Sequence, residues 1–229
     1  MSLIADNLTK VRIKIAAACK ACGRNSGSVK LMAVSKTKTV KMIEEALQAG
    51  QVDFGENYAQ ELQTKANALT HPNLNWHFIG HLQSNKVKDV VGTATLIHSL
   101  DRPSLADAIA KQAAKLGQPQ ACLIEVKLAS DGEKQGCLPE DLLGFAASLS
   151  TNPFLSIHGL MTIGTATTDK DLTRSEFATL KHLLDTLNQT KKFSGTLTEL
   201  SMGMSHDFDL AIAEGATLIR VGTAIFGDR

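Results

Sequence analysis

The hydrophobic positions of the first 23 residues repeat with the period of a helix. Lysines and arginines stand between apolar side chains at Ile4, Leu8, Val11, Ile15, Ala18 and Cys22. Because apolar residues at alternating spacings of four and three share one helical face, the pattern predicts an amphipathic helix over residues 1–23. One face of this helix is expected to be buried and the other to be solvated.

After this segment, short apolar or β-branched runs alternate with helical patterns. The runs lie near residues 30–35, 52–54, 75–79, 96–98, 121–127, 155–160, 197–200 and 217–221. Helix ends fall between them: Pro103 and Gly117 bound one helix, while Ser205 as N-cap and Gly215 as stop bound another. Strands that alternate with helices indicate parallel βαβ units.

Eight such units favour a closed barrel over an open sheet. A single (β/α)8 barrel of the TIM type accommodates eight strand–helix pairs in about 200 residues. An open doubly wound sheet usually begins with a GxGxxG turn, which this chain lacks. No linker rich in Pro, Gly or Ser divides the sequence. We therefore predict one barrel domain over residues 1–229, with the extra helix at its N-terminal end.

The composition is that of an ordinary globular protein and narrows the range of partners. The 229 residues are 43% hydrophobic, 21% charged and 4% aromatic, with Lys+Arg 24 against Asp+Glu 23. A net charge of +1 indicates no attraction to nucleic acid or to a membrane surface. No apolar stretch reaches the roughly 18 residues that span a bilayer. The first residues show no signal-peptide pattern, so we expect a cytoplasmic protein.

Four cysteines in a chain of this length do not predict a disulfide framework. Cys19 and Cys22 form a CxxC pair, but Cys122 and Cys137 stand apart and do not form a second one. A metal or redox role therefore competes with the packing of two small side chains on one helical face, which the pattern favours. No metal site is predicted, and the role of the pair is left open.

Lys36 is the first candidate for chemistry. In a barrel of this kind the active site lies at the carboxyl ends of the strands, and the first strand is expected to end at Lys36. The strand period of two puts Met32, Val34 and Lys36 on one face. If this face lines the barrel, a poorly solvated Lys36 amine is a nucleophile toward aldehydes. A surface lysine at the start of a loop is the alternative.

Two loops near the end of the sequence are typical of phosphate binding. The last strand leads into Gly222-Thr223, and the strand before it leads into Ser201-Met202-Gly203-Met204-Ser205. Barrels often bind phosphate with the loops after strands seven and eight, although ordinary tight turns are the alternative. Arg220 on the last strand needs an acceptor, either a ring nitrogen of a ligand or a structural salt bridge.

Further polar and sulfur side chains occur near the ends of other strands. Glu56 and Asn57 follow the second strand, where they could orient a ring substituent or cap the next helix. Met161 follows the sixth strand and lies either against a ligand or in the core. His77 and His81 are about 13 Å apart along an extended strand, which is too far for one metal ion.

Six motifs, spread over nearly the whole chain, resemble the pyridoxal phosphate homeostasis proteins. They are Ala33-Val34-Ser35-Lys36-Thr37-Lys38, Phe54-Gly55-Glu56-Asn57, Trp76-His77-Phe78-Ile79-Gly80-His81-Leu82-Gln83-Ser84-Asn85-Lys86, Gly159-Leu160-Met161, Leu200-Ser201-Met202-Gly203-Met204-Ser205 and Arg220-Val221-Gly222-Thr223-Ala224-Ile225-Phe226-Gly227. Two departures are Thr39, where this family frequently has a proline, and His206, where it frequently has an acidic residue.

The resemblance implies a barrel with pyridoxal 5′-phosphate (PLP) bound as an aldimine on Lys36 and with Arg220 facing the pyridine nitrogen. It also implies phosphate contacts from Ser201, Gly203, Gly222 and Thr223. The candidate cofactor-binding residues are therefore Lys36, Asn57, Met161, Ser201, Gly203, Arg220, Gly222 and Thr223. A guanidinium donates hydrogen bonds and cannot accept them, so the ring nitrogen would stay unprotonated and the electron-sink chemistry of PLP would be weak.

The chain also resembles the N-terminal domain of bacterial alanine racemases, which add a second domain that supplies a tyrosine and helps to form a dimer. This chain ends after the last predicted barrel helix, and Tyr58 is its only tyrosine. We therefore expect a non-enzymatic, monomeric PLP binder that supplies apo PLP-dependent enzymes. A small PLP-dependent amino-acid racemase is the alternative, and a Schiff-base aldolase without PLP is a third hypothesis.

Overall fold

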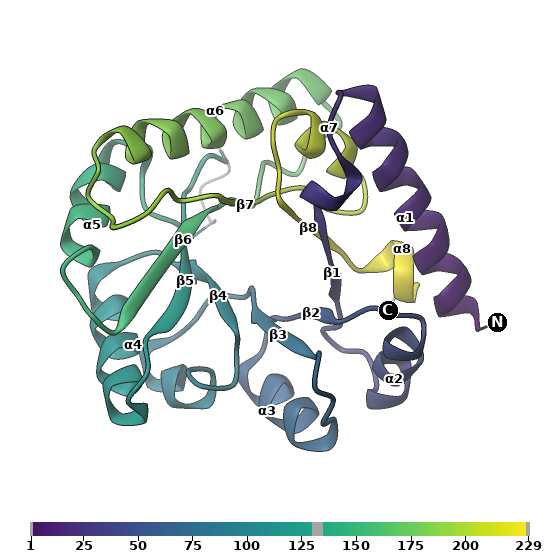
Figure 1. The fold of residues 1–229 in the computed structure, drawn as a ribbon, viewed down its shortest axis with the longest axis horizontal. Coiled ribbons are helices and arrows are strands. Elements are labelled where there is room, and N and C mark those ends of the chain that lie inside the picture. Colours follow the sequence, from purple (N-terminus) through teal and green to yellow (C-terminus); the bar gives the residue numbers. More distant parts are fainter. Residues whose placement is uncertain (1, 130–134, 228–229) are drawn as a thin grey trace.

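A computed structural model describes residues 2–129 and 135–227. In this part of the chain, eight parallel strands close into a barrel in the order β1 to β8, with β8 paired to β1 (Figure 1). The strands are β1 Lys30–Val34, β2 Asp53–Glu56, β3 Asn75–Phe78, β4 Leu96–Leu100, β5 Gln120–Glu125, β6 Leu155–Met161, β7 Glu199–Ser201 and β8 Leu218–Val221. The closed barrel confirms the predicted fold.

Helices surround the barrel and connect consecutive strands (Figure 1). The α-helices are α1 Leu3–Ala21, α2 Val40–Gln48, α3 Ala59–Ala68, α4 Pro103–Leu116, α5 Leu142–Leu149, α6 Lys170–Gln189, α7 Phe208–Ala213 and α8 Thr223–Phe226. Short 3-10 helices are η1 Ser26–Ser28, η2 Ser84–Asp89 and η3 Pro139–Asp141. The segment between β3 and β4 contains η2 in place of an α-helix, so this connection departs from the regular alternation of strands and α-helices.

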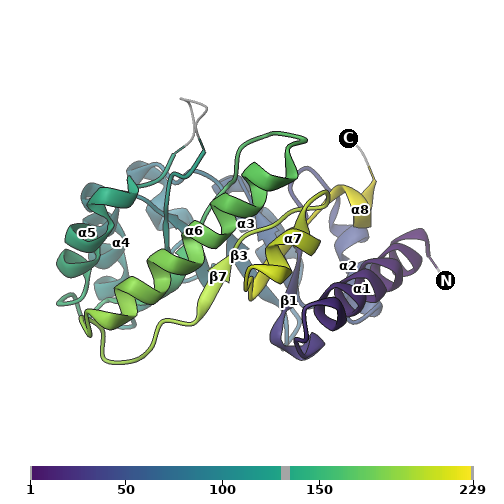
Figure 2. The ribbon, with the colours of Figure 1, turned by 90° about the horizontal axis from the view of Figure 1, so that it is seen from above.

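The N-terminal helix is confirmed, but its two cysteines have different environments. α1 lies outside the barrel against α7, α8 and α2 (Figure 2). Its apolar face ends at Cys19, which is fully buried four residues after Ile15. Cys22 is the C-cap of α1 and is exposed. The prediction that Cys22 shares the buried face is wrong because the helix ends at Ala21, before the next turn.

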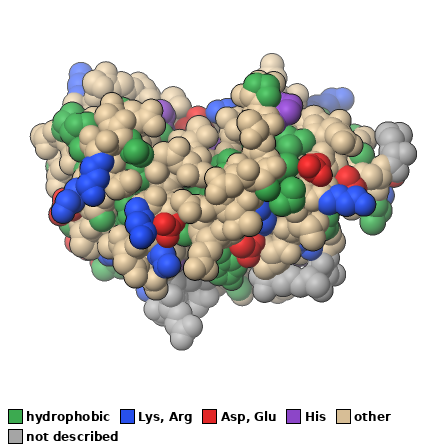
Figure 3. Space-filling model, turned by 90° about the horizontal axis from the view of Figure 1, so that it is seen from below, with side chains coloured by type: hydrophobic (Ala, Val, Ile, Leu, Met, Phe, Trp, Pro, Cys, Tyr) green, Lys and Arg blue, Asp and Glu red, His purple; other side chains and the backbone are tan. Residues whose placement is uncertain are grey.

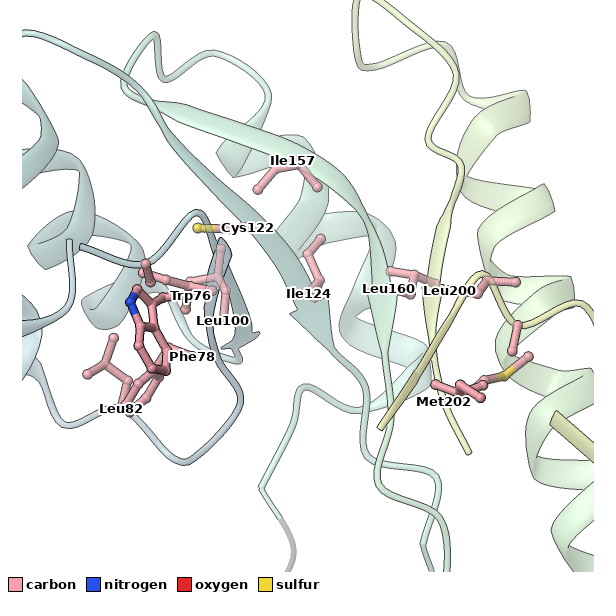
Figure 4. Packing of buried hydrophobic residues seen from close by; sticks show 14 of the residues in the cluster. Trp76, Phe78, Leu82, Leu100, Cys122, Ile124, Ile157, Leu160, Leu200 and Met202 are labelled. Atoms are coloured by element: carbon pink, nitrogen blue, oxygen red, sulfur yellow. The ribbon is translucent and has the colours of Figure 1, made fainter. Parts of the chain in front are cut away.

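The main hydrophobic core fills the layer between the strands and the surrounding helices. Figure 4 shows part of it, including Trp76, Phe78, Leu100, Leu160 and Met202. A smaller cluster occupies the inside of the barrel, because its members come from strands on different sides: Leu96, Leu123, Met161 and Leu218. Met161 is fully buried in this inner cluster, while its contact with a cofactor stays a prediction.

On the face that Figure 3 shows, charged side chains of both signs are mixed. Figure 3 shows basic and acidic side chains interspersed on one face, in keeping with the formal net charge of +1. Among the helices in the described part of the chain, none is both long and apolar enough to cross a membrane.

Candidate functional site

Four neighbouring strands bring most of the predicted residues to one end of the barrel. β7 pairs with β8, β8 with β1, and β1 with β2. Because the strands are parallel, the segments that follow them lie together at the carboxyl end of the barrel. In strand order these segments hold Gly203, Gly222–Thr223, Lys36 and Asn57. Motifs that are far apart in the sequence therefore converge on one mouth.

Lys36 lies in a turn after β1 rather than on the strand itself. β1 ends at Val34, and Thr37 has a left-handed backbone with a φ of 62°. The strand period therefore stops before Lys36, although Met32 is fully buried as that period predicts. The Lys36 side chain is partly buried. The position of the Lys36 side chain therefore depends on the hydrogen bonds that fix this turn.

The turn is anchored on both sides of Lys36 by a buried cluster around Lys65 of α3. The Lys65 ammonium donates to the carbonyl of Ser35 at 2.8 Å, to Glu56 Oε1 at 2.7 Å and to Glu61 Oε2 at 2.8 Å. The Ser35 hydroxyl donates to the same Glu56 oxygen at 2.6 Å. On the other side, the backbone N–H of Thr37 donates to Glu61 Oε2 at 2.8 Å. These bonds fix the residues before and after Lys36.

The electrostatics of this cluster depend on burial and on one ammonium group. Burial raises the pKa of Glu56, although hydrogen bonds from Lys65 and Ser35 act against it. Partial burial opposes ionisation of Glu61 too, but the bonds from Lys65 and from the Thr37 backbone outweigh it and lower its pKa. Lys65 is only 5% exposed, so its charge is balanced mainly by these two carboxylates.

Glu56 and Asn57 do not cap the helix that follows them. The N-cap of α3 is Tyr58, which makes no side-chain capping bond. Glu56 instead holds the Lys36 turn, whereas Asn57 Oδ1 is buried without a hydrogen-bond partner among the described residues. Asn57 also borders a cavity of about 390 Å³ over the ends of β2 and β3, together with His81 and Lys86. Its buried oxygen is therefore an acceptor without a partner in the described ranges, beside the end of β2.

The loop after β7 differs from the predicted one at Ser205. The following helix, α7, begins at Phe208 with Asp207 as its N-cap, so the prediction that Ser205 is the N-cap is wrong. The Ser205 hydroxyl instead accepts a hydrogen bond from the Thr223 hydroxyl at 3.2 Å. Two hydroxyls from the loops after β7 and β8 thus lie side by side.

Backbone groups complete this corner of the mouth. Gly203 has a left-handed backbone with a φ of 88°, and its carbonyl accepts from the Arg220 backbone N–H at 3.0 Å. The first bond within α8 runs from the Ile225 N–H to the Gly222 carbonyl. The N–H of Thr223 precedes this bond and is left outside the helical ladder. The corner therefore offers backbone and hydroxyl donors, as an anion requires.

Arg220 lies inside the barrel and is 5% exposed. Its guanidinium donates to the Ser201 hydroxyl at 2.7 Å and to the Thr162 carbonyl at 2.8 Å. Burial lowers its pKa to about 10, while the charges of Glu125 and Asp207 act in the opposite direction. Within residues 2–129 and 135–227, no carboxylate lies within salt-bridge distance of Arg220, so these observations do not support the salt-bridge alternative.

Ser201 is placed differently from the other predicted phosphate contacts. Its hydroxyl is fully buried between Arg220 and His98 Nδ1, which lies 2.9 Å away. The Thr223 hydroxyl pairs with Ser205 and not with Ser201. Contact between Ser201 and a phosphate stays a prediction, and Ser205 is the hydroxyl that the structure adds to the candidates.

Sequence reasoning missed two other residues of this region, Lys65 and His98. The only sequence feature that pointed to Lys65 was Glu61 four residues before it, and a Glu–Lys pair at this spacing is typical of an exposed helix surface. His98 lies within an apolar run, and its partner His77 is 21 residues away in the sequence. No local pattern therefore indicated this contact. Among the residues that the structure describes, no group of three His, Cys, Asp or Glu side chains is placed to hold a metal ion.

Comparison with known proteins places this architecture in a family. The family model described as "Alanine racemase, N-terminal domain" matches residues 7–229. The chain is 42% identical, over its full length and 97% of the relative, to a pyridoxal phosphate homeostasis protein of Pseudomonas aeruginosa. It is also 42% identical, over 98% of the chain and 97% of the relative, to the protein of that name from Aquifex aeolicus.

Solved structures give the same result. PipY of Synechococcus elongatus with PLP bound superposes with a TM-score of 0.87 at 39% identity, covering 98% of this chain and all of that one. Alanine racemase of Corynebacterium glutamicum superposes with a TM-score of 0.77 at 17% identity, covering 99% of this chain and 61% of that one, and shares the fold alone. The chain therefore belongs to the pyridoxal phosphate homeostasis protein family.

Proposed function

We propose that this protein binds PLP at the mouth of the barrel, with the Lys36 amine as the covalent attachment point. It holds the cofactor as a single-domain monomer and supplies it to apo PLP-dependent enzymes, without robust catalysis of its own. The observation that carries this proposal is the convergence of Lys36 and the loops at Gly203 and Gly222–Thr223 at the ends of neighbouring strands. The PLP-bound structure of a relative that is 39% identical supports it.

The residues at the mouth fit the four polar groups of PLP. Lys36 offers an amine to the aldehyde, and the hydroxyls of Thr223 and Ser205 offer donors to the phosphate. Arg220 can only donate, which suits the lone pair of a pyridine nitrogen. The orphaned Asn57 Oδ1 is an acceptor, which suits the ring hydroxyl. When bound, PLP supplies an aldehyde that reacts with amines.

Arg220 favours storage of PLP over catalysis. With a pKa of about 10, the guanidinium is charged at neutral pH and cannot accept a proton. A ring nitrogen that faces it accepts a hydrogen bond and stays unprotonated, which weakens the electron sink that PLP enzymes use. The racemase alternative rests on the shared fold, while Tyr58, the only tyrosine, is 51% exposed.

Borohydride reduction of the PLP-loaded protein tests the attachment point. Reduction should fix the cofactor to the peptide that contains Lys36, and Lys36→Ala should lose both the label and the yellow colour. Lys30→Ala, which alters an exposed lysine at the other end of β1, should keep both. A label that persists on another lysine in Lys36→Ala would refute the proposal. Turnover of D- or L-amino acids near the ordinary enzyme median of about 10 per second would instead favour a racemase.

Thr223→Val tests the phosphate corner. The substitution removes one hydroxyl that can donate to a phosphate dianion, and a hydrogen bond to a charged group contributes about 1.5–3 kcal/mol. We expect the affinity for PLP to fall at least tenfold in a fluorescence titration, while the affinity for pyridoxal, which lacks the phosphate, stays almost unchanged. Equal weakening of both ligands would show that the hydroxyl supports the fold and not the phosphate.

A further inference from the structure

We propose that Asp53, His77 and His98 are positioning residues for Arg220, joined to it through Ser201 by a one-way chain of hydrogen bonds inside the barrel. The chain deepens the proposed function and rests on it, because Arg220 is there the partner of the PLP ring nitrogen. It begins at Arg220, near the carboxyl end of β8, and ends at Asp53, the first residue of β2 and therefore at the amino end of the barrel.

Contacts within hydrogen-bond distance connect every step of this chain. The Arg220 Nη1 atom lies 2.7 Å from Ser201 Oγ, which lies 2.9 Å from His98 Nδ1. His98 Nε2 is 3.0 Å from His77 Nδ1, and His77 Nε2 is 3.2 Å from Asp53 Oδ1. The five residues come from β8, β7, β4, β3 and β2, so the chain crosses the barrel rather than following one strand.

The two ends of the chain set the direction of its bonds when each ring carries one proton. A guanidinium has no acceptor, so the Ser201 hydroxyl accepts from Arg220. An ionised carboxylate has no donor, so Asp53 accepts from His77 Nε2. His77 Nδ1 is then an acceptor for the proton on His98 Nε2. This leaves His98 Nδ1 to accept the one proton of the Ser201 hydroxyl.

Burial keeps the middle of the chain in one protonation state. His98 is fully buried, and burial, reinforced by the charge of Arg220, holds its pKa well below the ordinary value. Asp53 at the far end is partly exposed, and the bonds from His77 and Asn75 lower its pKa although burial opposes them. The chain therefore joins a permanent cation to an ionised carboxylate through a neutral His98.

Three other ionisable groups act on the two ends of the chain. Glu125 and Asp207 face Arg220, and Lys30 acts on Asp53. None of them is hydrogen-bonded to Ser201 or to either histidine in the described structure. The chain therefore connects the position of Arg220 to residues of β2, β3 and β4. Hydrogen bonds in such a series polarise and strengthen one another.

The ligand-free protein provides the direct test. Nitrogen-15 NMR should show His98 as a neutral ring protonated at Nε2, with no change between about pH 6 and 8, where an ordinary histidine titrates. Ser201→Ala should break the direction imposed on His98 and change its tautomer signal. Ser99→Ala is the matched control, because Ser99 is also buried on β4 beside His98 but its hydroxyl has no described partner. It should leave the signals unchanged.

Ligand binding separates this role from a phosphate contact. If Ser201 positions Arg220, Ser201→Ala should weaken PLP and pyridoxal alike, by about three- to tenfold, the loss of one ordinary hydrogen bond. If Ser201 binds the phosphate, only PLP should weaken. Asp53→Asn, at the partly exposed end of the chain, should weaken both ligands and shift the absorption of the bound cofactor without unfolding the protein.

The outcomes distinguish the chain from the proposed function. An Nδ1-protonated or doubly protonated His98 at neutral pH would overturn the chain, as would unchanged ligand affinities in both Ser201→Ala and Asp53→Asn. Absence of PLP binding by the native protein would overturn the proposed function and, with it, the role of the chain in positioning a cofactor partner. The hydrogen-bond direction seen by NMR would then still stand as a property of the barrel.

Discussion

Lys65→Met is expected to destabilise the fold by about 3–5 kcal/mol, the usual cost of removing one partner from a buried ion pair. Methionine fills a similar volume but leaves the fully buried Glu56 carboxylate with only the Ser35 hydroxyl as its partner. The Ser35 carbonyl also loses the bond that anchors the Lys36 turn. Urea unfolding at pH 7 measures the first effect. A PLP titration of the folded variant measures the second, and we expect weaker binding because Lys36 is no longer held in place.

The pH dependence of this loss has a definite sign. Without the ammonium, the pKa values of Glu56 and Glu61 both rise, so the folded variant takes up protons more readily than the native fold. The stability deficit is therefore complete at pH 7 and should shrink as the pH falls toward the ordinary glutamate value of 4.5. A deficit that grew on acidification would contradict the ion-pair explanation.

Lys181→Met is the matched control for Lys65→Met. Lys181 also pairs with a carboxylate on its own helix, Asp185, but both side chains are nearly half exposed. Exposed pairs of this spacing contribute about 0.3–0.5 kcal/mol. The same substitution should therefore cost several kilocalories less at position 181, and equal losses would show that methionine itself disturbs α-helices in this protein.

The barrel could be predicted because its strands and helices carry strong local patterns. Parallel strands are covered on both faces and read as continuous apolar runs, as in Leu96–Leu100, where every residue is buried. The helix from Pro103 to Leu116 carries its own start and stop signals, and Gly117 takes the left-handed conformation that such a stop requires. Patterns of this kind need no knowledge of distant residues.

The polar contacts inside the barrel could not be predicted in the same way. His98 and Ser201 are 103 residues apart, and strand periodicity indicates which way a side chain points without naming its partner across the barrel. Lys65 is a further case, because lysines are almost never fully buried unless paired. Only the packing of α3 against β2 brings Glu56 to it.

Two differences at the mouth arise from backbone geometry. Thr37 adopts a left-handed φ of 62°, and this turn removes Lys36 from the strand on which simple alternation places it. In the loop after β7, the Asp207 carboxylate accepts from the Met204 N–H at 2.6 Å, and Asp207 rather than Ser205 becomes the N-cap of α7. The Ser205 hydroxyl is then available to Thr223, so a residue expected to cap a helix lies in the corner where we propose that the phosphate binds.

Gly203→Ala is the second substitution with a large expected effect. The glycine has a φ of 88°, and a Cβ added there would lie 2.5 Å from the Ala211 Cβ and 3.1 Å from the Phe208 Cα. A left-handed backbone costs about 1–2 kcal/mol for an ordinary residue, and overpacking adds about 1–3 kcal/mol. We expect unfolding measurements to show a loss of about 2–5 kcal/mol.

Gly117→Ala is the control that separates the cost of the left-handed backbone from the cost of the collision. Comparison of the two variants also tests whether the collision affects PLP binding. Gly117 has a similar φ of 71°, but nothing lies within 4 Å of its added Cβ, so only the backbone cost should appear there. The atoms that an added Cβ meets at Gly203 belong to α7, so we expect relief of the collision to shift α7 and, with it, the Ser205 loop that contacts Thr223. PLP affinity should therefore fall in Gly203→Ala and persist in Gly117→Ala. Equal stability losses in the two variants would show that the collision contributes nothing. An unchanged PLP affinity in Gly203→Ala would show that this loop does not bind the phosphate.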